Sequence, residues 1–185
     1  MASNKVNLGI GLASGMFYTA PASTALPAYP TDSTGLASWE LSGAVTADGI
    51  VWSTGKDSDP LRNWAKEVER LIASDEGGTV QAPLMYTNQK TLETIFGADN
   101  VTVDAATSSH GALTSVTVAP GVSASPAAFL FIMKDGDDTI MLGTSNGIVR
   151  DVEDINFSPT EAITWTATIE AASWTFMKDD GQVTS

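Results

Sequence analysis

The segment AITWTATIEA, residues 162–171, constrains the fold most strongly, because its apolar and polar residues alternate without a break. Ile163, Trp165, Ala167 and Ile169 occupy every second position, and three threonines and a glutamate fill the positions after them. A repeat of two places successive side chains on opposite faces of a β-strand. The segment therefore predicts a strand with one apolar face turned inward and one polar face turned outward.

A β-hairpin is predicted where AAFLFIM (127–133) runs through KDGDD into TIMLG (139–143). The dipeptide Asp135-Gly136 is typical of tight hairpin turns. Further β-branched or aromatic segments predict additional strands. These segments are GMFYTAP (15–21), LASWELSGAVTADG (36–49), with apolar points at Leu36, Trp39, Leu41 and Val45, IVWST (50–54), TVQAPLMYT (79–87) and GIVRDVEDINF (147–157).

One short helix is predicted at NQKTLETIFGADN, residues 88–100. Asn88 can cap its start and Gly97 suits its end. The helix would carry one apolar stripe made of Leu92, Ile95 and Phe96. Several strands, short turns and one helix together predict a mainly β protein: an antiparallel β-sandwich or barrel with one short flanking α-helix.

Residues 59–72 allow two interpretations from the local sequence. Asp59 and Pro60 suit the start of a helix, and the apolar residues after them recur at helical spacing. Alternatively, EVERLIA (67–73) forms a strand that pairs with residues 79–86 across the turn SDEGG. Helix propensity favours the first interpretation, but tertiary context often overrides propensity.

Composition indicates one globular domain over residues 1–185, with a Pro-rich N-terminal arm at 1–35 and a short C-terminal tail at 177–185. No apolar run approaches the roughly 20 residues that span a bilayer, so no membrane contact is expected. The absence of cysteine excludes disulfides and thiolate metal sites, and it suits a reducing cytoplasm. A formal net charge of −13 disfavours tight binding of nucleic acid, whose phosphates it repels.

No residue pattern points to an enzyme, a cofactor or a metal site. His110 lies alone in a small-residue loop, which indicates a solvated side chain. The group DGDD at 135–138 has only part of the spacing of a calcium loop, and a plain turn explains it better. Asp151, Glu153 and Asp154 indicate an acidic surface stripe and lack the context of a glycosidase pair.

The order of these motifs resembles the major tail tube proteins of long, non-contractile-tailed bacteriophages, especially those that infect actinobacteria. The resemblance covers most of residues 36–176. It rests on SGAVTADGI (42–50), DSDPLRNWAKEVERLI (57–72), PLMYTNQKTLETIFGADNVT (83–102), FLFIMKDG (129–136) and GIVRDVEDINFSPTEAITWTATIEA (147–171).

The resemblance implies a structural virion protein that self-assembles into hexameric rings, stacked as a tube through which DNA passes without specific binding. It implies assembly in the bacterial host cytoplasm, and the tape measure protein and other tail proteins as partners. In the family, an extended loop before the tryptophan helps to stack the rings and a strand follows it. We therefore expect a strand at 67–73 paired with 79–86. The ring-stacking candidates are Lys56, Asp57, Asp59, Arg62 and Trp64.

In such a tube the negative charge of the chain would have a function, because a negatively charged bore would repel passing DNA. Six copies at −13 give −78 for each ring. Exposed charges act over about 8–10 Å at physiological salt, so only lumen-facing residues matter. The acidic lumen candidates are Asp135, Asp137, Asp138, Asp151, Glu153 and Glu170.

Other functions remain open at this stage. A tail terminator or head–tail connector would form single rings rather than a polymer. A carbohydrate-binding β-sandwich module would need an exposed aromatic platform, and a β-sandwich hydrolase would need an unfamiliar site. The candidate residues for such a platform are Trp39, Trp52, Trp64, Trp165 and Trp174. Their apolar surroundings are more typical of core or interface positions.

Overall fold

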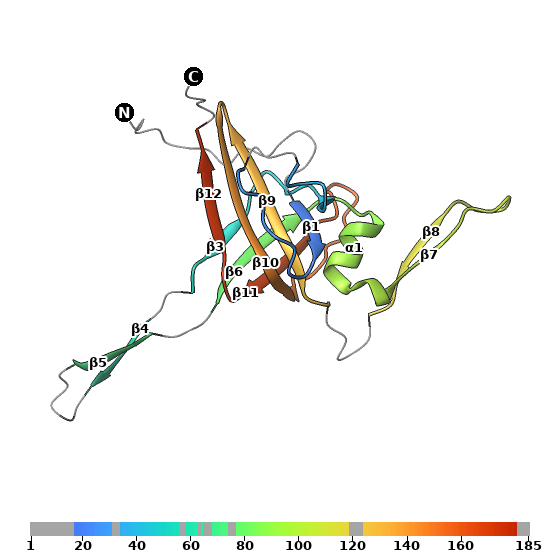
Figure 1. Ribbon diagram of the computed structural model, residues 1–185. Coiled ribbons are helices and arrows are strands. Elements are labelled where there is room, and N and C mark those ends of the chain that lie inside the picture. The colour runs from blue at the N-terminus through green and yellow to red at the C-terminus, as the bar shows by residue number, and fades with distance from the viewer. Residues whose placement is uncertain are drawn as a thin grey trace, which may run out of the picture.

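The chain folds as a mainly antiparallel β structure with one α-helix, as predicted (Figure 1). The computed structural model describes residues 17–30, 34–55, 58–62, 64, 68–73, 77–118 and 124–180. In chain order the elements are β1 (Phe17–Pro21), β2 (Glu40–Gly43), β3 (Val51–Ser53), β4 (Ser58–Arg62), β5 (Val68–Ala73), β6 (Gly78–Leu84), α1 (Gln89–Phe96), the 3₁₀ turn η1 (Ala98–Asn100), β7 (Val101–Asp104), β8 (Leu113–Val116), β9 (Ala127–Asp135), β10 (Asp138–Val152), β11 (Trp165–Ala171) and β12 (Thr175–Asp179).

The main sheet has the strand order β2-β1-β9-β10-β11-β6-β3, and β12 pairs with β10 next to the end of β11. The sheet curls until the continuation of β2 reaches β6, where Val45 forms an antiparallel bridge with Leu84. The Met85 amide also donates to the Ala44 carbonyl at 3.0 Å. The sheet therefore closes in the manner of a small barrel around one core.

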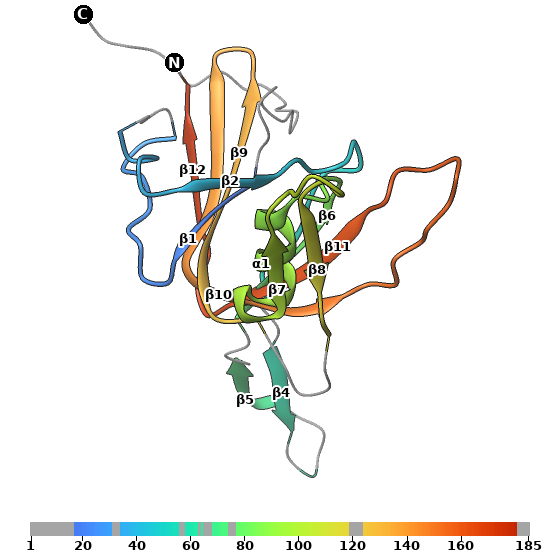
Figure 2. The same ribbon diagram turned by 90° about the vertical axis from the view of Figure 1, so that its right-hand side faces the viewer.

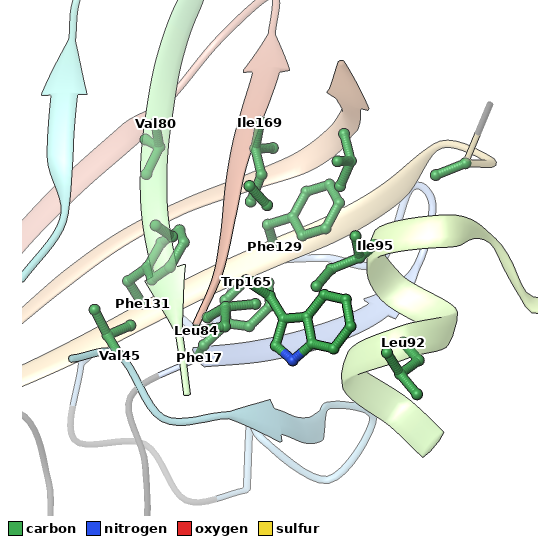
Figure 3. Close-up of a cluster of buried hydrophobic side chains, with 14 of the residues drawn as sticks. Phe17, Val45, Val80, Leu84, Leu92, Ile95, Phe129, Phe131, Trp165 and Ile169 are labelled. Atoms are coloured by element: carbon green, nitrogen blue, oxygen red, sulfur yellow. The ribbon is translucent and has the colours of Figure 1, made fainter. Parts of the chain in front are cut away.

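Aromatic side chains fill this core (Figure 3). The ring of Phe17 stacks on Phe129 and Phe131, with centroid distances of 6.0 and 4.9 Å, and all three are fully buried. Trp165 meets the ring of Phe96 from α1 edge to face at 5.8 Å. The alternation along β11 is confirmed, because Trp165, Ala167 and Ile169 are buried and the residues between them are not.

A second apolar cluster lies on the outer face of β1, β9 and β10. Leu130, Ile132 and Met141 project there from the sheet, and Leu26 and Trp39 pack on them from the segment between β1 and β2. That segment thus covers one half of the outer face. Leu41, expected among the apolar points of its segment, is 40% exposed instead.

The helix confirms its sequence signals. The side chain of Asn88 accepts a hydrogen bond from the Thr91 amide at 2.8 Å, which is the predicted N-cap. At the other end Gly97 has a φ of 88°, a conformation that glycine adopts without strain, and its amide donates to the Glu93 carbonyl. Leu92 and Ile95 are buried and hold the helix on the core.

The segment that allowed two interpretations forms strands, so the helical one is wrong. β5 exists as predicted, but its predicted pairing with residues 79–86 is also wrong. β5 pairs with β4, because the chain reverses between Arg62 and Val68 rather than at SDEGG. β6 pairs with β11 and β3 instead.

The predicted β9–β10 hairpin is confirmed, with Gly136 at a φ of 62° in its turn. GIVRDVEDINF does not begin a separate strand, since β10 continues through it to Val152. Two strands include residues predicted to lie in terminal segments: β1 falls within the predicted N-terminal arm, and β12 includes residues 177–179.

Two hairpins project from the main sheet as arms (Figures 1 and 2). The β4–β5 arm connects β3 to β6, and the β7–β8 arm connects η1 to the segment before β9. Figure 1 shows the β4–β5 arm leaving at the lower left and the β7–β8 arm leaving at the right, beyond α1. The two arms therefore point to opposite sides of the molecule.

Candidate interaction surfaces

The described part of the chain contains no constellation typical of catalysis or metal binding. His110 is exposed near the tip of the β7–β8 arm, where its Nδ1 lies 2.8 Å from the Gly111 carbonyl oxygen. No group of three or more His, Cys, Asp or Glu residues among the described residues could hold a metal ion. Within the same residues, no helix has the length and apolar character needed to cross a membrane. Surfaces for contact with other molecules are thus the features to consider.

The ring-stacking candidates lie on or beside the β4–β5 arm. Asp59 and Arg62 are part of β4, whereas Lys56 and Asp57 fall outside the described residues. Trp64 follows β4 at the end of the arm and its side chain is 103% exposed. A fully exposed tryptophan leaves a large apolar area in water, and tryptophan is prominent among the residues that dominate protein interfaces.

Three acidic lumen candidates occupy the turn of the β9–β10 hairpin. Asp137 is exposed, Asp135 is half-buried and Asp138 is buried. The carboxylate of Asp138 lies 3.3 Å from Lys178 Nζ on β12, so its charge is offset within the chain. This pair also joins β12 to the hairpin tip.

The other three candidates, Asp151, Glu153 and Glu170, gather at the far end of β10 and on β11. Glu170 Oε2 accepts from Arg150 Nη1 at 2.7 Å, and Glu153 accepts a hydrogen bond from Gln81 on β6. Asp138 and Asp151 are thirteen residues apart on β10. At about 3.3 Å per residue the two acidic groups are separated by roughly 40 Å of strand, so the structure does not bring all six together.

A polar surface therefore covers the outer face of β11, β6 and the end of β10. Thr166, Thr168 and Glu170 face this side of β11, opposite the buried residues of the same strand, and Gln81 lies across from Thr168 on β6. Helix α1 packs on the other side, where Ile95 belongs to the core that contains Trp165. Three carboxylates and the guanidinium of Arg150 give this surface a formal charge of −2.

The five tryptophans do not form an aromatic platform. Trp39 and Trp165 are buried, and Trp174 is half-buried with its Nε1 donating to the Gly78 carbonyl at 2.8 Å. Trp52 and Trp64 are exposed, but Trp52 is on β3 and Trp64 is on the projecting arm. Most of them thus serve the core, in line with the apolar surroundings noted in the sequence.

An exposed aromatic pair, which the sequence did not reveal, lies between β3 and β12. The rings of Trp52 and Phe176 stack with centroids 6.4 Å apart and planes within 7° of parallel. Their exposed fractions are 38% and 53%, and Val51 beside them is 58% exposed. The two strands are far apart in sequence, so only the fold brings these rings together.

The β7–β8 arm was also missed from the sequence. Val101 pairs with Val116, and the hydroxyls of Thr102 and Ser115 lie 2.7 Å apart across the two strands. A usable signal was present, because VTV and SVTV flank a segment of small and turn-forming residues that includes Ser-Ser-His-Gly.

Comparison with known proteins agrees with the resemblance drawn from the sequence motifs. A family model described as "Phage tail tube protein" matches residues 1–180, which is nearly the whole chain. No curated protein matches the sequence. The match accounts for a chain whose conspicuous features are surfaces rather than a reactive site.

Proposed function

We propose that this chain, which belongs to the phage tail tube protein family, assembles into rings of six copies that stack as the tube of the phage tail. The family match over residues 1–180 is the observation that carries this proposal. A chain that forms both a closed ring and a stack needs two different heterologous contacts, one that closes and one that repeats along an axis. The opposed arms and the exposed aromatic side chains supply surfaces for both.

The bore of the tube is assigned to the polar outer face of β10, β11 and β6. Asp151, Glu153 and Glu170 against Arg150 give −2 for each copy, hence −12 for a ring of six. Between the carboxylates this face presents threonine hydroxyls, which carry no positive charge. DNA leaving the capsid during genome ejection would meet repulsion and no site of attachment.

Asp135 and Asp137 extend the acidic lining if the hairpin tip also reaches the bore. Asp138 contributes less in this proposal, because Lys178 Nζ lies 3.3 Å from its carboxylate and the Asp138 side chain is itself buried. The lining thus depends mainly on carboxylates that solvent can reach.

Stacking of one ring on the next is assigned to the β4–β5 arm, with Trp64 as its apolar anchor and the charged residues Lys56, Asp57, Asp59 and Arg62 around it. A projecting arm can reach past its own ring, which a residue on the main sheet cannot. The tape measure protein inside the tube and the other tail proteins at its ends complete the set of partners.

Negative-stain electron microscopy of the purified chain tests the proposal. Long hollow rods are the expected result. Discrete discs that do not grow with concentration would favour a single-ring tail terminator or connector, and compact particles at every concentration would contradict self-assembly altogether.

A further inference from the structure

The β7–β8 arm lacks a covering layer among the described residues. It is a hairpin of two four-residue strands that meets the rest of the chain at its base, where Thr117 N donates to the Asn100 carbonyl at 3.0 Å. Val103, Leu113 and Val118 are 45%, 54% and 69% exposed. A two-stranded hairpin is only marginally stable alone in water, so an arm of this kind gains most from packing against a partner.

The arm also differs from the rest of the chain in charge. Residues 101–118 contain one carboxylate, Asp104, and no lysine or arginine, although the whole chain carries 22 acidic and 9 basic residues. Copies with a net charge of −13 repel one another, and the buried centres of interfaces are depleted of charge. An arm with a single charged residue is therefore suited to lie between two acidic copies.

A complementary surface lies on the other side of the molecule. The stacked pair Trp52–Phe176 presents an apolar area at the margin of the sheet. In Figure 1 strands β3 and β12 lie to the left of the sheet and the β7–β8 arm leaves to the right. A contact between these two surfaces on different copies is heterologous, the type of contact from which rings and stacks are built.

We propose that the β7–β8 arm of one copy packs on the Trp52–Phe176 pair of a neighbouring copy. Val103 shares a face of the hairpin with Thr114, and Leu113 shares the opposite face with Asp104. The face of Val103, which carries no charge, supplies the aliphatic contact to the exposed rings, and removal of both apolar areas from water drives the association. The inference rests on the proposed self-assembly and adds to it the two surfaces that meet. Trp64 and the β4–β5 arm take no part in this contact.

The first test places charge in the proposed contact. The double variant Val103→Glu and Leu113→Glu is compared with a matched control, Tyr29→Glu and Phe157→Glu, which adds the same charge at exposed sites elsewhere. We expect the critical concentration for assembly to rise by at least about tenfold for the arm variant, since central interface residues carry most of the binding energy. The control is expected to stay near the wild type, and circular dichroism checks that both variants are folded.

The second test identifies the partner surface and uses the absence of native cysteine. Chains carrying Val103→Cys are mixed with chains carrying Phe176→Cys, and a short bismaleimide is added after assembly. A crosslinked dimer containing one chain of each kind is expected, and the mixture of Val103→Cys with Phe157→Cys is expected to give much less.

The outcomes separate this inference from the function on which it rests. If the wild-type chain forms no rings or tubes, the proposed function fails. If the wild type and the charged arm variant assemble equally well, or if Val103→Cys crosslinks as well to position 157 as to position 176, the arm contact is refuted while the tube remains.

Discussion

The two arms have the same architecture and opposite chemistry. Each is a two-stranded antiparallel hairpin that projects from the closed sheet, and β7–β8 contributes Val101 and Val116 at its base to the main core. The β4–β5 arm and its connections, residues 54–77, contain ten charged residues, whereas residues 101–118 contain one. The same element, a projecting hairpin, thus presents a highly charged surface in one arm and a nearly uncharged surface in the other.

The difference implies two kinds of contact. Charged side chains act over several ångströms and are screened by salt, so the β4–β5 arm suits contacts that orient one ring against another. Val103 and Leu113 act only on removal from water, so the β7–β8 arm suits a contact with close packing.

The largest effect is expected from removing each arm. Thr54 and Gly78 flank the β4–β5 arm next to the paired residues Ser53 and Thr79, so an Asn-Gly turn can replace residues 55–77. The shortened chain should keep a cooperative thermal transition within a few degrees of the wild type, because β4 and β5 form a two-stranded sheet separate from the main sheet. Electron microscopy should show rings without tubes.

The matched deletion replaces residues 103–114 by Asn-Gly between Thr102 and Ser115, which face each other across β7 and β8. It should also leave the body folded but should prevent ring formation. If the two deletions give the same assembly defect, the proposed division between the arms is wrong.

Trp64→Ala should give the next largest effect. The tryptophan is fully exposed in the single chain, so its loss should change the free energy of unfolding by less than about 0.5 kcal/mol. As an interface anchor it should raise the critical concentration for tube growth by about tenfold or more. Tyr29→Ala, another exposed aromatic outside both arms, is the control, and light scattering measures the growth.

Arg62→Glu should weaken tube growth by a smaller factor, on the order of a few-fold, because it reverses one charge on the arm that is assigned to oriented contacts. The loss should shrink at 1 M salt, where the screening length falls to about 3 Å. A loss of growth that is independent of salt would show that the charge of Arg62 is not the cause.

Asp104→Asn should have the smallest effect. It removes the only carboxylate of the β7–β8 arm, and the side chain is exposed. If apolar packing drives this contact, the critical concentration should stay within about twofold of the wild type, as exposed single charges contribute little. A large change in sedimentation behaviour would mean that the contact of the β7–β8 arm also depends on the charge of Asp104.

Local signals determined which elements could be predicted from the sequence. Asn88 and Gly97 marked the helix because their caps need only neighbouring backbone groups. The alternation in β11 and the turn of the β9–β10 hairpin were equally local. The pairing partner of β5 could not be predicted from local signals. A turn is possible on either side of the strand, before Val68 or at SDEGG, and only the tertiary structure selects between the two.

The interaction surfaces were less predictable for the same reason. The stacked pair of Trp52 and Phe176 joins residues more than a hundred positions apart, and no local rule connects them. The burial of Asp138 was equally unpredictable. Its sequence neighbours suggest a solvent-exposed turn, whereas the fold buries it beside Lys178. Exposure is a property of the tertiary arrangement, so sequence alone could only supply candidates.

A reconstruction of the assembled chain by cryo-electron microscopy tests the central claim most directly. The account predicts a hollow tube of stacked rings with sixfold rotational symmetry, in which Glu170 and Thr168 on the outer face of β11 line the bore. A tube with that face on its outside, or a chain that remains monomeric at high concentration, would contradict it.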